Sequence, residues 1–245
     1  MTVIAANLQA VRARIAAVER ESGRGNARAT AGVEDGSTAV TLLAVSKTKP
    51  AAAIREAHAA GQGAFAENYV QEGVDKILEL RDLPLVWHFI GPLQSNKTRL
   101  VAAHFDWVHT VEREKIAQRL SEQRDAGQPP LQVCLQVNVS GETSKSGVTP
   151  TELPGLARAV AGMARLQLRG LMCIPEPTSD VVLQRQRFAQ LRHLLETLNV
   201  ELGLSMDTLS MGMSDDLEAA IAEGATMVRI GSAIFGARAV SHEAA

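Results

Sequence analysis

The feature that most constrains the fold is a regular alternation of short apolar runs with helical patterns from residue 39 onward. The apolar runs are four to nine residues long and rich in β-branched side chains, and each is followed by a turn and then a helical stretch. Strands that alternate with helices pair in parallel through right-handed crossovers, and eight such units match a (β/α)₈ (TIM) barrel. The predicted strands are residues 39–45, 64–67, 85–90, 107–110, 131–139, 166–174, 208–211 and 227–230.

The N-terminal segment predicts an extra amphipathic helix before the first strand, ending near Gly23. Its apolar residues recur at alternating steps of four and three: Ile4, Leu8, Val11, Ile15 and Val18. Residues 23–38 are rich in Gly, Ala, Ser and Thr and predict a loop of unassigned role. Because no linker-like break divides the chain, we expect residues 1–245 to form a single α/β barrel domain. The alternative is an open doubly wound sheet, which usually carries a glycine fingerprint that is missing here.

Composition excludes several classes of function. The 25 basic and 27 acidic residues give a net charge of −2, so no basic field favours nucleic acid or anionic lipid. No apolar run approaches the roughly 18 residues of a membrane helix. Cys134 and Cys173 lie in apolar runs and predict buried free thiols in a reducing, cytoplasmic compartment. The six histidines and two cysteines lack the paired spacing of metal ligands, so we expect no metal site.

A barrel of this kind places its chemistry at the carboxyl ends of the strands. Lys47 follows the first predicted strand, and partial burial there favours the neutral amine that attacks an aldehyde. Only six of the 25 basic residues are lysines, and four of these follow predicted strands, at positions 47, 49, 97 and 145. The competing interpretation of Lys47 is a solvated lysine ahead of the helix that begins near Pro50.

Loops after strands seven and eight of such barrels hold phosphate. Arg229 lies inside the eighth apolar run, where a guanidinium requires either a structural salt bridge or a ligand. Gly231 and Ser232 follow it in a small-residue turn whose N–H groups are able to approach a phosphate. After strand seven, Ser214 is expected to cap the next helix. After strand two, Asn68 is placed to orient a ring hydroxyl.

These features together suggest pyridoxal phosphate (PLP), and several sequence blocks resemble the pyridoxal phosphate homeostasis proteins. That family has the barrel of the alanine racemase N-terminal domain (PLP fold type III) and lacks the racemase's second, β domain. The resemblance covers nearly the whole chain from residue 39. The blocks are LAVSKTKP (43–50), ENYVQE (67–72), HFIGPLQSNK (88–97), SKSG (144–147), RGLM (169–172), and residues 209–216 and 227–238.

The resemblance implies the role of each site residue. Lys47 is the lysine that forms the imine with PLP, and Arg229 faces the pyridine nitrogen. Ser214, Gly231 and Ser232 hold the phosphate, while Asn68 and Met211 line the cofactor. Three positions depart from the family's usual residues: Ala66 replaces Gly, Ser232 replaces Thr, and Cys173 replaces Ala.

An arginine at the pyridine nitrogen keeps that nitrogen unprotonated, which makes the ring a weak electron sink. Racemisation also needs a second base, which in the racemase is a tyrosine of the missing domain, whereas Tyr69 is the one tyrosine here. We therefore expect a non-catalytic, monomeric PLP carrier that passes its cofactor to PLP-dependent apo-enzymes. The alternatives are a PLP-dependent amino-acid racemase and a phosphosugar-binding barrel with an aldolase lysine. The recipients, and a second PLP site at Lys49, Lys97 or Lys145, stay open.

Overall fold

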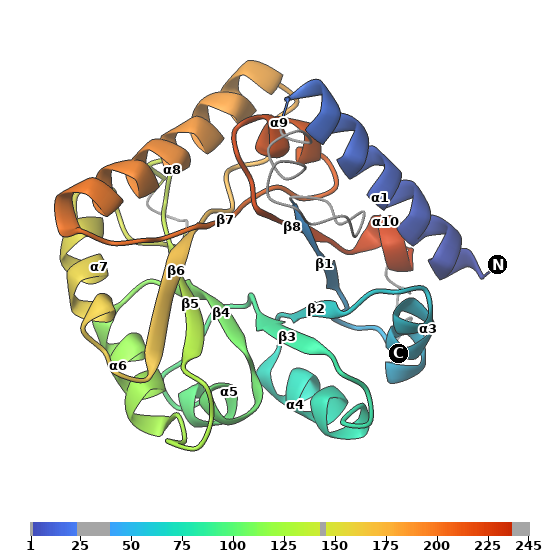
Figure 1. The fold of residues 1–245 in the computed structure, drawn as a ribbon, viewed down its shortest axis with the longest axis horizontal. Helices are drawn as coiled ribbons and strands as arrows, with labels where there is room; N and C mark the ends of the chain where they lie inside the picture. Colours follow the sequence, from blue (N-terminus) through green and yellow to red (C-terminus); the bar gives the residue numbers. More distant parts are fainter. Residues whose placement is uncertain (1, 24–39, 143–145, 237–245) are drawn as a thin grey trace, which may run out of the picture.

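The computed structural model describes residues 2–23, 40–142 and 146–236, and its eight strands form one closed parallel barrel in chain order (Figure 1). The barrel closes because β1 pairs with β8, from Thr41 opposite Met227 to Ala44 opposite Ile230, which rules out an open sheet. The predicted barrel is thus confirmed. The strands are β1 Thr41–Val45, β2 Ala64–Glu67, β3 Val86–Phe89, β4 Trp107–Val111, β5 Leu131–Gln136, β6 Leu166–Met172, β7 Thr208–Ser210 and β8 Met227–Ile230.

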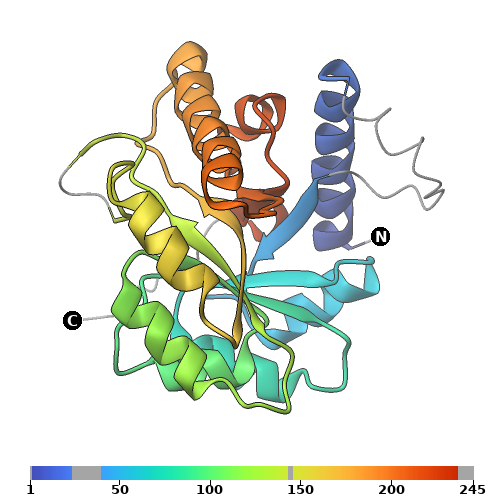
Figure 2. The ribbon, with the colours of Figure 1, turned by 60° about the vertical axis from the view of Figure 1, so that its left-hand side comes forward.

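The helices form a ring around these strands (Figure 1). The predicted N-terminal helix is confirmed as α1, which packs against α3, α9 and α10 and buries Leu8, Val11 and Ile15. Helix α9 lies between α1 and α8 (Figure 2). The helices of the described residues are α1 Val3–Glu21, α3 Ala51–Ala59, α4 Val70–Glu79, α5 Thr98–His104, α6 Glu114–Gln123, α7 Leu153–Ala161, α8 Val181–Leu202, α9 Leu217–Ala222 and α10 Ser232–Phe235. None of them is long and apolar enough to cross a membrane.

Two predicted strands end two or more residues earlier than expected. The runs 131–139 and 166–174 leave the sheet at Gln136 and Met172. Val137 and Val139 stay buried beyond the end of β5, so burial continues past the last residue of the strand. Hydrophobicity alone therefore overestimates strand length at the carboxyl rim of the barrel.

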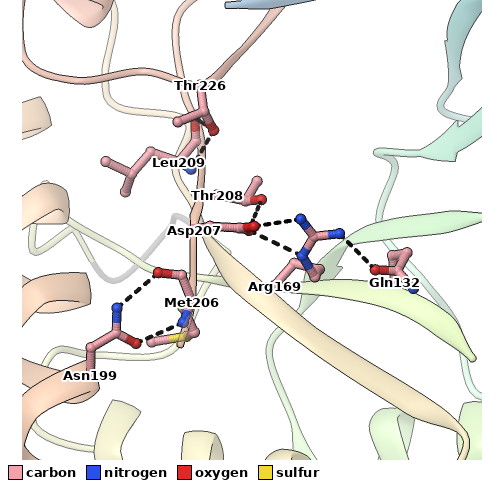
Figure 3. Close-up of polar contacts among 8 residues, drawn as sticks. All are labelled: Gln132, Arg169, Asn199, Met206, Asp207, Thr208, Leu209 and Thr226. Atoms are coloured by element: carbon pink, nitrogen blue, oxygen red, sulfur yellow. Dashed lines mark hydrogen bonds and ion pairs between the residues drawn. The ribbon is translucent and has the colours of Figure 1, made fainter. Parts of the chain in front are cut away.

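Side chains alternate between two cores, because successive strand residues point to opposite sides of the sheet. The larger core lies between the strands and the helices. The smaller one fills the barrel and includes Leu43, Ala66 and Trp107. At the amino-terminal end, Arg169 forms an ion pair with Asp207 at 2.6 Å (Figure 3). Its guanidinium also lies over the Trp107 ring. The cavity described below lies at the opposite, carboxyl end.

Both cysteines are buried free thiols, as predicted. Burial raises the pKa of Cys134 and the pKa of Cys173 to about 12, so the reactive thiolate is scarce at neutral pH. We expect the native protein to leave dithiobis(nitrobenzoate) essentially unreacted, whereas denaturant exposes both thiols to the reagent. Counting released thiolate with and without guanidinium tests this, and rapid reaction of the native chain would contradict it.

Candidate functional site

A cavity of about 320 Å³ opens at the carboxyl end of the barrel. Its wall is built from the ends of six strands and the turns that follow them, which is the usual site of chemistry in this fold. The structure brings six of the seven predicted site residues to this wall. They are Lys47, Asn68, Ser214, Arg229, Gly231 and Ser232. Val45, Lys49, Ile90, Ile174, Met213, Asp215 and Gly236, which the sequence analysis did not assign to the site, complete it.

Met211 does not reach this wall. It is fully buried in the core between strands and helices, whereas Ser210, one residue earlier, contacts groups inside the barrel. The period-two alternation explains the difference, because adjacent residues of a strand point to opposite faces. Ser210, rather than Met211, is therefore the residue of β7 that supports the site.

Lys47 follows β1 on the barrel side of the alternation, two residues beyond Val45 and four beyond Leu43, both packed inside the barrel. It is half-buried at the cavity wall. Lys49 lines the same cavity, and its Nζ donates to the carbonyl oxygens of Phe235 at 3.0 Å and Gly236 at 3.2 Å. Backbone acceptors at the end of α10 therefore hold Lys49.

Asn68 carries an unsatisfied acceptor. Its Oδ1 is buried and has no hydrogen-bond partner among the described residues, although Asn68 lines the cavity. A buried acceptor without a donor costs about 1–3 kcal/mol. A ligand that supplies a hydroxyl or N–H at this point would recover that cost.

Arg229 is held by neutral acceptors inside the barrel. It is 4% exposed, and its guanidinium donates to Ser210 Oγ and to the Cys173 carbonyl oxygen, each at 2.9 Å. Ser210 Oγ also lies 2.7 Å from His109 Nδ1, and His109 Nε2 lies 2.9 Å from His88 Nδ1. Burial lowers the pKa of Arg229, yet arginine remains protonated at neutral pH. The site therefore holds the Arg229 cation in place with neutral hydrogen-bond partners. Because these partners do not neutralise its charge, the charge is available to interact with a ligand.

The two buried histidines of this hydrogen-bonded row, His88 and His109, are neutral. Burial lowers the pKa of His88 from 6.5 to about 3, and burial, His88 and Arg229 lower the pKa of His109. His88 is thus a hydrogen-bonded barrel histidine, and it stacks on Trp107. Neither ring is suited to exchange a proton near neutral pH.

This burial predicts a pH dependence of stability. The unfolded chain gains a proton on His88 below about pH 6.5, while the folded chain resists protonation until about pH 3. The unfolding free energy should therefore fall with acidification across this window, by up to about 1.4 kcal/mol per pH unit for one histidine. Urea titrations of His88→Gln and the wild type at a series of pH values measure the contribution. Parallel profiles would contradict it, and His193→Gln, at an exposed position, is the matched control.

The turns after β7 and β8 form the other end of the cavity. A Cβ on Gly231 would lie 3.3 Å from the Val45 carbonyl oxygen, so glycine allows this turn to approach β1 closely. Ser214 is not the helix cap that the sequence predicted. Asp216 accepts from the Met213 N–H, and α9 begins only at Leu217. A turn closed by this contact therefore precedes the helix and leaves Ser214 at the cavity wall.

Known proteins resemble this chain over nearly its whole length. The family model described as "Alanine racemase, N-terminal domain" matches residues 4–239. The pyridoxal phosphate homeostasis protein of Pseudomonas aeruginosa is 63% identical over 97% of both chains. The protein of that name from Escherichia coli K12 is 55% identical, over 97% of this chain and 98% of its own.

Solved structures agree with this result. PipY of Synechococcus elongatus, solved with PLP bound, is 38% identical with a TM-score of 0.79, over 95% of this chain and all of its own. Alanine racemase of Corynebacterium glutamicum is 18% identical with a TM-score of 0.66, over 96% of this chain and 61% of its own, and supports the fold alone.

Proposed function

This chain belongs to the pyridoxal phosphate homeostasis protein family, with the fold of the alanine racemase N-terminal domain, and we propose that it binds PLP at the carboxyl end of its barrel. The observation that carries the proposal is the single cavity that joins Lys47, Asn68 and Arg229 to the small-residue turns after β7 and β8. PLP offers a complementary group for each: an aldehyde, a ring hydroxyl, a pyridine nitrogen and a phosphate. The PLP-bound PipY structure, at 38% identity, supports the same ligand.

The residues present suit this ligand. Bound PLP would supply an aldehyde that reacts with a primary amine, and Lys47 would be that amine. The buried Asn68 Oδ1 accepts from the ring hydroxyl, and Arg229 donates to the pyridine nitrogen. Ser214, Gly231 and Ser232 hold the phosphate through hydroxyl and N–H groups. Ser232, where the family usually has Thr, retains the hydroxyl.

We further propose that the protein stores and delivers PLP in the cytoplasm, as a monomer that passes it to apo-enzymes, without a catalytic cycle. The fixed charge of Arg229 disfavours protonation of the pyridine nitrogen and so weakens the ring as an electron sink. Tyr69, the residue type that supplies the second base in the racemase, is 54% exposed and does not line the cavity. These two features support a carrier over a racemase.

Visible absorption of the purified protein with PLP, followed by borohydride reduction and peptide mapping, tests the binding. We expect an absorption band that reduction removes, with the modification on Lys47. A chain that stays colourless with excess PLP would overturn the proposal.

Two further assays separate a carrier from a racemase. Mixing the loaded protein with a PLP-free apo-enzyme should restore that enzyme's activity, with a free-PLP trap present to exclude simple release. Incubation with alanine or other amino acids in heavy water should leave their Cα hydrogens in place. Cα exchange that disappears in Lys47→Ala would instead establish a racemase.

A further inference from the structure

A buried ion cluster stands directly behind the turn that carries Lys47. Lys76 Nζ, on α4, donates to the Ser46 carbonyl oxygen at 2.7 Å, to Glu67 Oε1 at 2.8 Å and to Glu72 Oε1 at 2.6 Å. Ser46 Oγ donates to Glu67 Oε1 at 2.6 Å, and the Thr48 N–H donates to Glu72 Oε1 at 2.5 Å. We call Glu67, Glu72 and Lys76 the α4 clamp. It contacts the residues on both sides of Lys47.

The clamp also joins two strand ends that supply the cavity. Ser46 immediately precedes Lys47 after β1, and Glu67 is the last residue of β2, immediately before Asn68. Alternation places Ser46 and Glu67 on the helix side of the barrel while Lys47 and Asn68 line the cavity. Fixing Ser46 therefore fixes the direction of Lys47.

The turn at Lys47 needs such support. Thr48 has φ +63°, the sole non-glycine residue in the described ranges with a positive φ. This conformation costs about 1–2 kcal/mol for a residue with a Cβ, so the surrounding structure must hold it. The hydrogen bond from the Thr48 N–H to Glu72 is a contact that does so.

Burying this cluster carries a large desolvation free energy, which stability alone does not explain. The Glu67 side chain is fully buried and that of Lys76 is 8% exposed, and Glu67 Oε2 has no hydrogen-bond partner among the described residues. Burial raises the pKa of Glu67 despite the opposing effect of the Lys76 ammonium. Apolar residues of similar size often stabilise such a position as well as a buried ion pair does. The contacts of the clamp converge on Ser46 and Thr48, the two neighbours of Lys47. A role in general stability does not explain this convergence.

We propose that the α4 clamp is a positioning device that holds the turn 46–48 and directs the Lys47 amine into the cavity. This inference rests on the proposed function, because it takes Lys47 to be the residue that captures PLP. The clamp residues do not line the cavity, and they act through the turn that carries Lys47.

The test distinguishes the orientation of the Lys47 amine from noncovalent binding of the PLP ring and phosphate. The ligands are PLP and pyridoxine 5′-phosphate, which has an alcohol in place of the aldehyde and does not require the amine. Lys76→Met removes the ammonium from the full-length, cofactor-free chain, and Lys115→Met, at an exposed position of α6, is the matched control. Stopped-flow absorbance measures PLP capture, and calorimetry measures the affinity for pyridoxine 5′-phosphate.

In Lys76→Met, PLP capture should slow by roughly tenfold or more, since small misplacements of a reacting group have large kinetic effects. Affinity for pyridoxine 5′-phosphate should stay within about twofold of the wild type, and Lys115→Met should match the wild type in both assays. Unchanged capture by Lys76→Met, or equal loss of both ligands in a folded variant, would overturn the proposal. A wild-type chain that captures no PLP would instead overturn the proposed function as well.

A second variant covers the case in which Lys76→Met does not fold. Glu72→Met removes the acceptor of the Thr48 N–H at a side chain that is 29% exposed and is better tolerated. Glu79→Met, at an exposed position on the same helix, is its control. The same selective loss of PLP capture is expected, and capture at the wild-type rate by Glu72→Met would overturn the proposal independently.

Discussion

Replacing Lys47 by alanine is expected to reduce borohydride-fixed PLP to the background level while leaving the fold intact. Lys47 is half-buried at the cavity wall, so its truncation leaves the packed cores untouched. The remaining polar wall still holds the ring and phosphate, and weak binding without a covalent bond should persist. The measurement is the mass of the tryptic peptide after reduction, together with the visible spectrum and the melting temperature.

Lys49→Ala is the matched control, because Lys49 lines the same cavity. Its ammonium is held by the Phe235 and Gly236 carbonyl oxygens, so its loss should leave the Lys47 label in place. Labelling of Lys47→Ala at wild-type yield would contradict the assignment and transfer it to another lysine. A second label in the wild type at Lys49 or Lys97 would reveal an additional PLP site, as would a label at Lys145, which lies outside the described residues.

The sequence predicts the barrel well because its signal is repeated. Eight apolar runs alternate with helices, and each run lies on an observed strand even where its ends differ. The same period places Lys47 and Arg229 at the carboxyl rim, since both follow or belong to clearly apolar strands. The position of Met211 away from the cavity wall is harder to predict, for the opposite reason. A strand of three residues gives too little alternation to decide whether Ser210 or Met211 points inward.

The α4 clamp shows what a one-dimensional pattern does not contain. Glu72 and Lys76 are spaced as an ordinary exposed helix pair, and nothing in their spacing reveals that Lys76 reaches a strand end. Glu67 alone is recognisable in the sequence as unusual, because it places a carboxylate at the end of an apolar strand. Its partner comes from the next helix, and the contact to Ser46 comes from the previous strand. Such a cluster becomes visible only when three elements are brought together in space.

The sequence also does not reveal the row of hydrogen bonds that joins Arg229, Ser210, His109 and His88 below the cavity. His88 bonds to His109 on β4, 21 residues further along the sequence, and His109 in turn bonds to Ser210 on β7, 101 residues further on. Their meeting depends on barrel closure, which brings inward residues of different strands into the same layer. These hydrogen bonds connect Arg229 to the barrel interior. The site is therefore supported from below by this hydrogen-bonded row and from the side by the α4 clamp.

Gly91→Ala is expected to be the most damaging small substitution near the cavity. A Cβ at this position would lie 1.9 Å from the Asn68 carbonyl oxygen and 2.7 Å from its carbonyl carbon, and backbone atoms are unable to rotate away. Either β3 or the end of β2 must move. Overpacking typically costs about 1–3 kcal/mol, and a clash this severe should lower the unfolding free energy by at least about 3 kcal/mol. Urea unfolding measures the loss.

Gly155→Ala makes the same chemical change where nothing lies within 4 Å of the new Cβ, inside α7. It should raise the unfolding free energy by roughly 0.5–1 kcal/mol, because alanine favours the helix and restricts the unfolded chain. Any Gly91→Ala protein that does fold should also bind PLP more weakly, because the displaced backbone carries Asn68 away from the cavity. A loss below about 1 kcal/mol with unchanged PLP affinity would show that the β2 and β3 ends adjust freely, and that Asn68 is not held in place by Gly91.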